Sequence, residues 1–384
     1  MNKAAIIAIQ MKLPVLLWGP PGVGKTSWLK QVAKSLHLQF EGIIASIREP
    51  SDFGGLPVIT DGGVVLESPA WAKRLAEVKT SLNEWQDSRL ALKALGDPVQ
   101  AMLLIDEIST APPAVQAALL TVILDNIVGD TRLPNSVAVV AAANPPEQAA
   151  GGWDLAPPMA NRFIHLDVGI NAFDWADAFM AGFPAPQVEA LPINWHTGIA
   201  EQRALVGSFI KARPELVLRV PESESDAGRA WPSPRTLDMS ASVLAAVKAV
   251  GGDDELRNEL IRGCIGTAGM ELLAYVDNLD LPDPEELLEN PKSFKYPEEG
   301  DKQYAILGSV VAAANRNLTP KRWTAAWDIL EIACKAGGAD VAAGSARTMV
   351  NEYKRLEREG VNLPLPTEQV APFIPILRES GLMK

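Results

Sequence analysis

The first 180 residues combine two patterns of hydrophobic and polar positions. Short, uninterrupted apolar runs predict strands that are buried on both faces. Apolar residues at helical spacing lie between them, most clearly in the segment 114–125. Strands that alternate with helices are typical of a parallel sheet covered on both faces, so we expect an α/β domain. The predicted strands are residues 14–18, 42–47, 101–105 and 137–143.

Two tight β-hairpins are predicted, the first outside this sheet and the second leading towards the strand that begins at Val137. Residues 58–60 and 64–66 flank Asp61-Gly62-Gly63, and residues 126–128 lead into Gly129-Asp130. Asp-Gly and Gly-Gly pairs favour the narrow turns that join antiparallel strands. Turn chemistry by itself does not distinguish a functional hairpin from an idle one.

Strand signals disappear beyond residue 183. Prolines break every periodicity across residues 183–192, which is typical of a linker. From Asn194 onwards helical patterns dominate, interrupted at residues 221–234 and in the Pro- and acid-rich stretch 277–299. We expect two all-helical parts. We interpret the acidic stretch as a solvated connector, because it lacks the glycine and the spacing of a calcium-binding loop.

Composition narrows the classes of function. Hydrophobic residues make up 47% and charged residues 21% of the 384 residues, as in folded proteins. The net charge of -12 disfavours broad adhesion to nucleic acid or anionic lipid, although a narrow basic channel is compatible with it. Two cysteines and three scattered histidines do not suit a disulfide framework or a zinc enzyme. A reducing, cytoplasmic compartment fits best.

The amino-terminal segment is apolar but carries no targeting signal that we recognise. Lys12 and Pro14 interrupt it, and glycines follow directly. No stretch of the chain approaches the roughly 20 apolar residues that a membrane-spanning helix needs. We therefore expect a soluble protein.

A glycine-rich turn lies between the first predicted strand and the helix after it. Residues 19–26 match the phosphate-binding pattern of Gly, four residues, Gly, Lys, and Ser or Thr. Glycines let backbone N–H groups converge on phosphate oxygens, a lysine neutralises the outer phosphates, and a hydroxyl holds Mg²⁺. A dinucleotide-binding turn is disfavoured, because Ser27 stands where its third glycine would be. The residues predicted to bind the nucleotide are Gly19, Pro20, Pro21, Gly22, Val23, Gly24, Lys25, Thr26 and Ser27.

Polar residues follow the ends of two other predicted strands. Asp106 and Glu107 end one apolar run, and Asn144 ends another. The carboxyl ends of parallel strands meet at one edge of a sheet, so these side chains should lie near the phosphate-binding loop. We expect Asp106, with Thr26, to bind Mg²⁺ and Glu107 to orient and polarise a water for attack on the γ-phosphate. Asn144 would position the same water.

In this order the motifs resemble those of the AAA+ ATPases, and among them the MoxR-like family. Residues 19–26 look like the Walker A motif, residues 103–107 like Walker B, and Asn144 like sensor 1; the two hairpins favour the branch that contains MoxR. The resemblance covers roughly residues 10–285. It implies ATP and Mg²⁺ as cofactors and ATP hydrolysis as the activity.

The same resemblance assigns two arginines. Arg162 is the candidate arginine finger, reaching the nucleotide of a neighbouring subunit, and Arg235 is the candidate sensor 2 of a helical lid. A guanidinium from outside the phosphate-binding loop would stabilise the charge that builds on the γ-phosphate. Many MoxR-like proteins carry Asp where this chain has Asn161. The sequence leaves open whether Arg235 acts on its own subunit's nucleotide or on the next one's.

The implied fold class is α/β. We expect a P-loop AAA+ module with a parallel sheet flanked by helices, followed by an all-helical lid and a helical C-terminal extension. The nucleotide-binding domain would span residues 1–183, the lid 194–285 and the extension 290–384. No motif is evident in the extension.

The resemblance also implies a mode of action. A homo-hexameric ring would remodel a protein client, with a von Willebrand factor A domain protein as partner. The hairpin at residues 58–66 would line the central opening, or it is only a surface hairpin. The alternative is a nucleic-acid motor or restriction-type NTPase, which the acidic charge disfavours. A scaffold that binds ATP without turnover is disfavoured because Lys25, Glu107 and Arg162 are all present.

Overall fold

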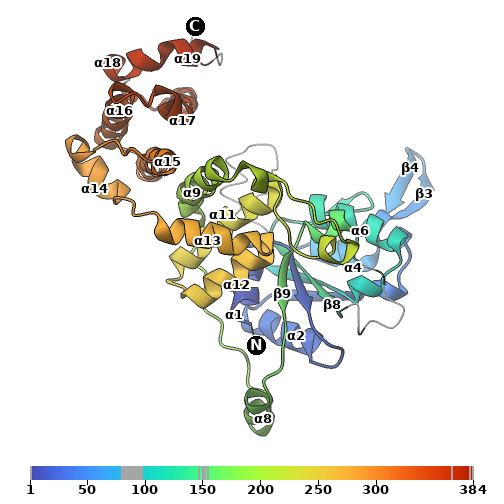
Figure 1. The fold of residues 1–384 in the computed structure, drawn as a ribbon. Helices are drawn as coiled ribbons and strands as arrows, with labels where there is room; N and C mark the ends of the chain where they lie inside the picture. Colours follow the sequence, from blue (N-terminus) through green and yellow to red (C-terminus); the bar gives the residue numbers. More distant parts are fainter. Residues whose placement is uncertain are drawn as a thin grey trace. The chain divides into compact units, whose positions relative to one another are not determined.

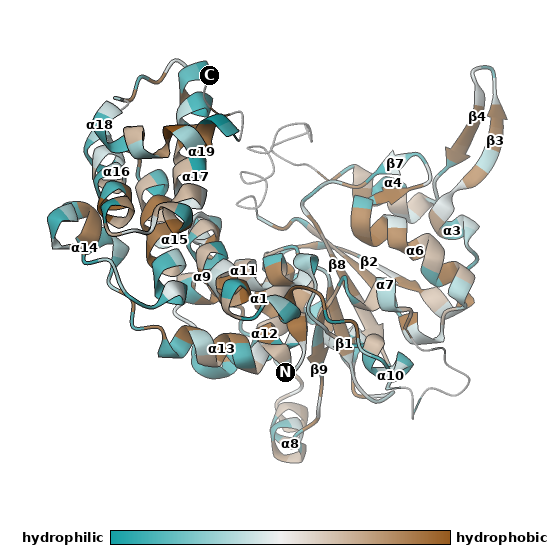
Figure 2. Ribbon diagram, turned by 45° about the horizontal axis from the view of Figure 1, so that its top comes forward, coloured by the Kyte–Doolittle hydropathy of each residue, from teal (hydrophilic) through white to brown (hydrophobic). Residues whose placement is uncertain are grey.

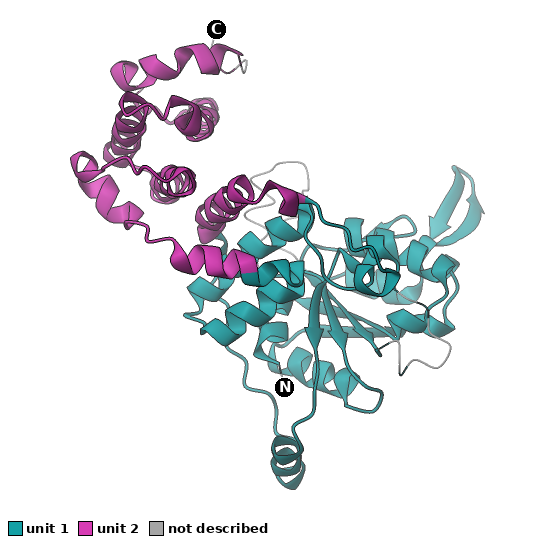
Figure 3. Cartoon of the chain, viewed as in Figure 1, with its two compact units in different colours: residues 1–196, 218–270 teal, residues 197–217, 271–384 magenta. Residues whose placement is uncertain are grey.

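The structure is a computed structural model that describes residues 2–78, 98–145, 148, 153, 155–364, 366–379 and 382. The chain divides into two compact units (Figure 3). Unit 1 contains residues 1–196 and 218–270, and unit 2 contains residues 197–217 and 271–384.

Unit 1 is built on a five-stranded sheet (Figure 1). All of its strands are parallel, as the sequence predicts. The predicted strand 42–47 is displaced, because pairing with the neighbouring strand ends at Ile44. The edge strand was not predicted, since its four residues include a histidine and an aspartate and do not form an apolar run. In spatial order the strands are β2 (Gln39–Ile44), β5 (Ala101–Asp106), β8 (Val137–Ala143), β1 (Val15–Trp18) and β9 (Ile164–Asp167).

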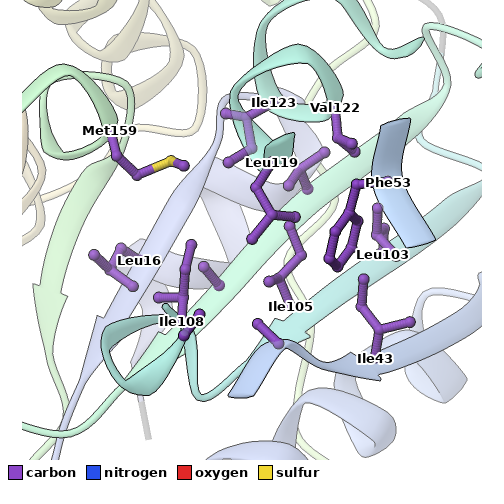
Figure 4. Packing of buried hydrophobic residues seen from close by; sticks show 14 of the residues in the cluster. Leu16, Ile43, Phe53, Leu103, Ile105, Ile108, Leu119, Val122, Ile123 and Met159 are labelled. Atoms are coloured by element: carbon purple, nitrogen blue, oxygen red, sulfur yellow. The ribbon is translucent and has the colours of Figure 1, made fainter. Parts of the chain in front are cut away.

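Helices cover both faces of the sheet. On one face a buried cluster joins Leu16, Leu103 and Ile105 of the strands to helix residues such as Leu119 and Met159 (Figure 4). This face is covered by α4 (Ala70–Ala76), α6 (Pro113–Asp125), α7 (Pro157–Ala160) and the short α3 (Ser51–Gly54). The other face is covered by α1 (Lys3–Gln10) and α2 (Lys25–Ser35).

Helix α1 was not predicted, and its burial explains why. All six residues from Ala4 to Ile9 are buried. A helix that is apolar all round has no polar face, so its sequence shows no helical periodicity. Asn2 caps it by accepting a hydrogen bond from the Ala5 backbone N–H at 3.0 Å.

Both predicted hairpins are present. The first pairs β3 (Leu56–Thr60) with β4 (Gly63–Glu67), and the second pairs β6 (Ile127–Val128) with β7 (Thr131–Arg132). The first hairpin projects from its unit (Figure 2). Apolar side chains on both of its strands are exposed. Ile59, at its tip, is 87% exposed.

A short helix interrupts the segment between β9 and the Pro-rich linker. This helix, α8 (Ala172–Met180), begins at Asn171, whose side chain accepts hydrogen bonds from Phe173 N and Asp174 N. None of its residues is buried, and Phe173 is 82% exposed. The remaining helices of unit 1 are α10 (Glu224–Ala227), α11 (Pro234–Ala249) and α12 (Asp254–Ile265), and α13 (Ala268–Asn278) spans the boundary between the units.

Unit 2 is all helical within its described residues, as predicted for this part of the chain. Its core contains the fully buried Trp323 and Trp327. Gly308 of α15 faces Ala204 of α9, where an added Cβ would lie 2.5 Å from the Ala204 Cβ, so the glycine permits close packing of these helices. The helices are α9 (Ile199–Ala212), α14 (Pro284–Glu289), α15 (Gly300–Arg316), α16 (Pro320–Lys335), α17 (Ala339–Arg358), α18 (Thr367–Val370) and α19 (Ile374–Glu379).

The interpretation of residues 277–299 as a solvated connector is wrong in part. Within this stretch Asp283 caps α14, and Leu287 and Leu288 of this helix are buried in the core of unit 2. Glu285 forms an ion pair with Arg322 of α16, and the hydrogen bond from Arg322 lowers the pKa of that carboxyl group. The acidic residues therefore include a helix cap and an interhelical partner.

The compact units divide the chain differently from the predicted lid at residues 194–285. Residues 218–270 pack with the α/β module, whereas α9 packs against α15 in unit 2. Over the residues that the structure describes, no helix combines the length and the apolar character required to cross a membrane.

Candidate functional site

The predicted phosphate-binding loop joins the end of β1 to the start of α2. Gly24 is the cap residue of α2 and adopts φ 88°, and Gly22 adopts φ 82°. Both values lie in the left-handed region, which glycine enters without the steric cost that a Cβ imposes. The unpaired N–H groups and the positive end of the dipole of α2 therefore face the loop, an arrangement that binds anions.

Lys25 lies folded over this loop. Its Nζ donates hydrogen bonds to the backbone oxygens of Gly19 at 2.7 Å and Pro20 at 3.1 Å, and to Asn144 Oδ1 at 3.0 Å. The residue is 8% exposed. Burial lowers the pKa of Lys25, and the nearby Asp106 carboxylate opposes that shift. The structure thus brings the predicted lysine and Asn144 together; Pro146, in the turn after Asn144, lies outside the described residues.

Thr26 and Asp106 lie side by side on neighbouring elements. The Thr26 Oγ1 donates a hydrogen bond to Asp106 Oδ2 at 2.5 Å, and the second oxygen of Asp106 accepts from the Glu107 backbone N–H at 2.9 Å. A hydroxyl and a carboxylate are hard oxygen ligands of the kind that Mg²⁺ prefers beside nucleotide phosphates. The residues present therefore fit the predicted metal, which would replace the hydrogen bond between them.

Glu107 follows Asp106 at the end of β5 and adopts φ 58°. Its carboxylate accepts a hydrogen bond from the hydroxyl of Ser46. Sequence reasoning missed Ser46, because the predicted strand 42–47 placed it inside the sheet. In the structure β2 ends at Ile44, and Ser46 lies in the 3-10 turn Ala45–Ile47 at the same edge as Glu107. A serine that interrupts an otherwise apolar run was the available signal.

Residues 15–163 match the ATPase family associated with various cellular activities (AAA). The chain carries an AAA ATPase domain. Its enzyme class is ATP hydrolase, as the sequence predicted, and AAA domains bind ATP, typically with Mg²⁺.

A solved structure and the curated proteins complete the comparison. A crystal structure of a "putative ATPase" from Cytophaga hutchinsonii is similar over 72% of this chain and 88% of its own, with 19% identity and a TM-score of 0.46. None of the curated proteins matches the chain.

The two predicted arginines lie close together in unit 1. Arg162 is partly buried, and its Nη1 donates a hydrogen bond to the Pro158 carbonyl. Its Nε is buried with no hydrogen-bond partner in the described part of the chain. Burial lowers the pKa of Arg162, as does the charge of the nearby Arg235, whereas Asp125 opposes the shift. Arg235 is exposed in the first turn of α11.

These arginines and the phosphate-binding loop lie at opposite ends of the AAA sheet. Arg162 precedes β9, whose first residue pairs with Val15 at the start of β1. The phosphate-binding loop follows the last residue of β1. The length of this four-residue strand, about 13 Å, therefore separates the loop from the backbone that leads into β9. We therefore do not find the arginines gathered at the loop of their own AAA domain.

A buried hydrogen-bond chain connects the two ends of this sheet. Trp18, directly before the loop, donates from Nε1 to His165 Nδ1 at 2.9 Å, and His165 Nε2 lies 2.8 Å from the Ala160 carbonyl oxygen. Nδ1 must accept and Nε2 must donate, so the imidazole is neutral. The pKa of His165 is lowered to about 4, and burial is the main cause. The charge of Arg229, whose guanidinium lies 4.1 Å from the centre of the Trp18 ring, contributes to this lowering.

The lowered pKa of His165 predicts a loss of stability in acid. Below pH 6.5 His165 becomes protonated in the unfolded chain, whereas in the folded protein it stays neutral down to about pH 4. The free energy of unfolding therefore falls as the pH is lowered from 6.5 to about 4. The lowered pKa of His165 corresponds to a loss of about 3 kcal/mol in the free energy of unfolding across this pH range. Urea unfolding followed by circular dichroism should show a steeper loss from pH 7 to 4.5 in wild type than in His165→Gln. If the stability of wild type and of His165→Gln depended on pH in the same way, the lowered pKa of His165 would be contradicted.

Proposed function

We propose that the chain is a ring-forming, Mg²⁺-dependent ATPase of the MoxR-like type that remodels a protein partner. The observation that carries the ring is the separation of Arg162 and Arg235 from the phosphate-binding loop of their own domain. The phosphate-binding loop lies at one end of the sheet and the arginines at the other. In a head-to-tail contact, the arginines of one subunit would therefore face the loop of the next subunit. Such contacts generate closed rings when the rotation between subunits closes.

In the proposed reaction each residue near the loop has a separate role. Backbone N–H groups of the loop and the Lys25 ammonium bind the phosphates, and Thr26 and Asp106 would hold Mg²⁺, which supplies charge neutralisation. Glu107 orients a water and accepts its proton. Asn144, hydrogen-bonded to Lys25, lies where it can hold the same water.

The arginines complete the site of the adjacent subunit. Charge that develops on the transferred phosphoryl group is stabilised by a guanidinium from outside the loop. Since Arg162 and Arg235 lie together, we infer that both act on the neighbour's nucleotide. A hexamer is the expected assembly.

Exposed apolar side chains support a protein partner. The β3–β4 hairpin exposes Ile59 and Val64, and α8 exposes Phe173 and Met180. Ile59 and Val64 are paired across the hairpin, and exposed apolar patches mark contact surfaces in many proteins. The net charge of -12 favours a protein over nucleic acid as the partner, and a von Willebrand factor A domain protein is our candidate.

The test combines turnover with assembly. Purified protein should release phosphate from ATP only with Mg²⁺. Light scattering after gel filtration should give about six times 41.2 kDa when nucleotide is present. A monomer that turns over ATP at every concentration would overturn the ring. Salt-sensitive stimulation by DNA would favour the nucleic-acid motor instead.

A further inference from the structure

The side chain of Asn161 is buried between the turn that carries Arg162 and the start of α11. It is 4% exposed. Its Nδ2 donates a hydrogen bond to the Trp231 carbonyl oxygen at 2.9 Å, and its Oδ1 accepts one from Ser233 Oγ at 2.6 Å. Both ends of the amide are therefore used, in a place where a lost hydrogen bond leaves a buried polar group unpaired.

The partners of Asn161 form the cap of α11. Ser233 is the N-cap residue: its Oγ accepts from Thr236 N at 3.3 Å, and its backbone N–H donates to Thr236 Oγ1 at 2.8 Å. Thr236 Oγ1 also donates to the Trp231 carbonyl oxygen at 3.0 Å. The four residues thus form a closed ring of buried hydrogen bonds. This ring ties the turn before β9 to the first turn of α11.

Each of the two arginines lies close in sequence to a residue of this hydrogen-bonded ring. Arg162 follows Asn161 directly, and Arg235 stands two residues after Ser233. Their guanidinium groups carry like charges and repel each other. Hydrogen bonds between neutral groups join the two segments that carry these arginines.

We propose that Asn161 is a positioning residue that holds Arg162 and Arg235 as one pair for a single nucleotide. The inference rests on the proposed function of the two arginines. An ionised aspartate in this position could accept from Ser233 but could not donate to the Trp231 carbonyl. The amide is the group that satisfies both contacts at once.

The test separates positioning from general structural damage. Asn161→Ala should lower kcat for ATP about 10- to 100-fold, because a displacement of about 1 Å costs that much, while KM and the Kd for ATP stay unchanged. Ser233→Ala, which removes the same contact from the other side, should act in the same direction. Asn171→Ala, which removes an asparagine cap from α8, is the matched control and should keep wild-type turnover.

A double-mutant cycle supplies the decisive measurement. If Asn161 works by placing Arg235 beside Arg162, Asn161→Ala should add little to the loss of kcat in Arg235→Ala. If the losses of kcat in the two single variants were additive, or if Asn161→Ala had the kcat of wild type, the inference would be overturned. The proposed function would still stand in that case, provided that the wild-type protein hydrolyses ATP. A wild-type protein without turnover overturns both.

Discussion

Arg162→Ala is expected to lower kcat for ATP hydrolysis by about three orders of magnitude while ATP still binds. The guanidinium would stabilise charge in the transition state, whereas the ground-state phosphates are held by the loop around Lys25 at the other end of the sheet. Steady-state phosphate release gives kcat, and isothermal titration gives the Kd. Arg74→Ala, which removes an exposed arginine paired with Glu41, is the matched control and should leave kcat unchanged.

Mixing two inactive proteins tests whether Arg162 acts between subunits. Lys25→Ala loses the phosphate contact but keeps its arginines, and Arg162→Ala keeps an intact loop. In a mixed ring some interfaces join an intact loop to an intact Arg162, so part of the activity should return. If light scattering confirms mixed assemblies and phosphate release stays at background, a site shared between subunits is ruled out.

Glu107→Gln is expected to lower kcat about 10²- to 10⁴-fold and to retain ATP. Glutamine keeps the size of the side chain and an oxygen that can accept the hydrogen bond from Ser46, but it does not take a proton from water. The contacts of Lys25, Thr26 and Asp106 are unchanged, so the Kd for ATP with Mg²⁺ should stay close to wild type.

The measurement for Glu107 is single-turnover hydrolysis of prebound ATP. Glu67→Gln, at the end of the exposed hairpin and paired with Lys73, is the control for loss of a carboxylate elsewhere. Equal rates for Glu107→Gln and wild type would refute the role of Glu107. Loss of ATP binding in this variant would instead show that the carboxylate supports the nucleotide site itself.

Some parts of the site were predictable because local sequence controls them. The phosphate-binding loop is a run of consecutive residues whose glycines adopt left-handed conformations, so its function is encoded by spacing alone. Asp106 and Asn144 were predictable as neighbours because both follow buried apolar strands and parallel strands end at one edge. The strands β5 and β8 have clear signals because both of their faces are covered.

Other parts depended on partners distant in the sequence. The exact end of β2 is decided by its pairing with β5, and that end moves Ser46 from a strand into a turn beside Glu107. Helix α1 has no amphipathic pattern because it is buried on all sides. Residues 197–217 pack with the C-terminal helices through α9 and α15, which no local pattern shows.

The sequence by itself determined the class of chemistry, because phosphate binding requires particular residue types at short, fixed spacing. Only the tertiary structure decided that Arg162 and Arg235 lie together and away from their own phosphate-binding loop. It also decided that Asn161, notable in the sequence only as a departure from a family pattern, joins their two segments. The physical reason is that these contacts link residues about 70 positions apart, and burial and hydrogen bonding across such separations are set by the packing of whole elements.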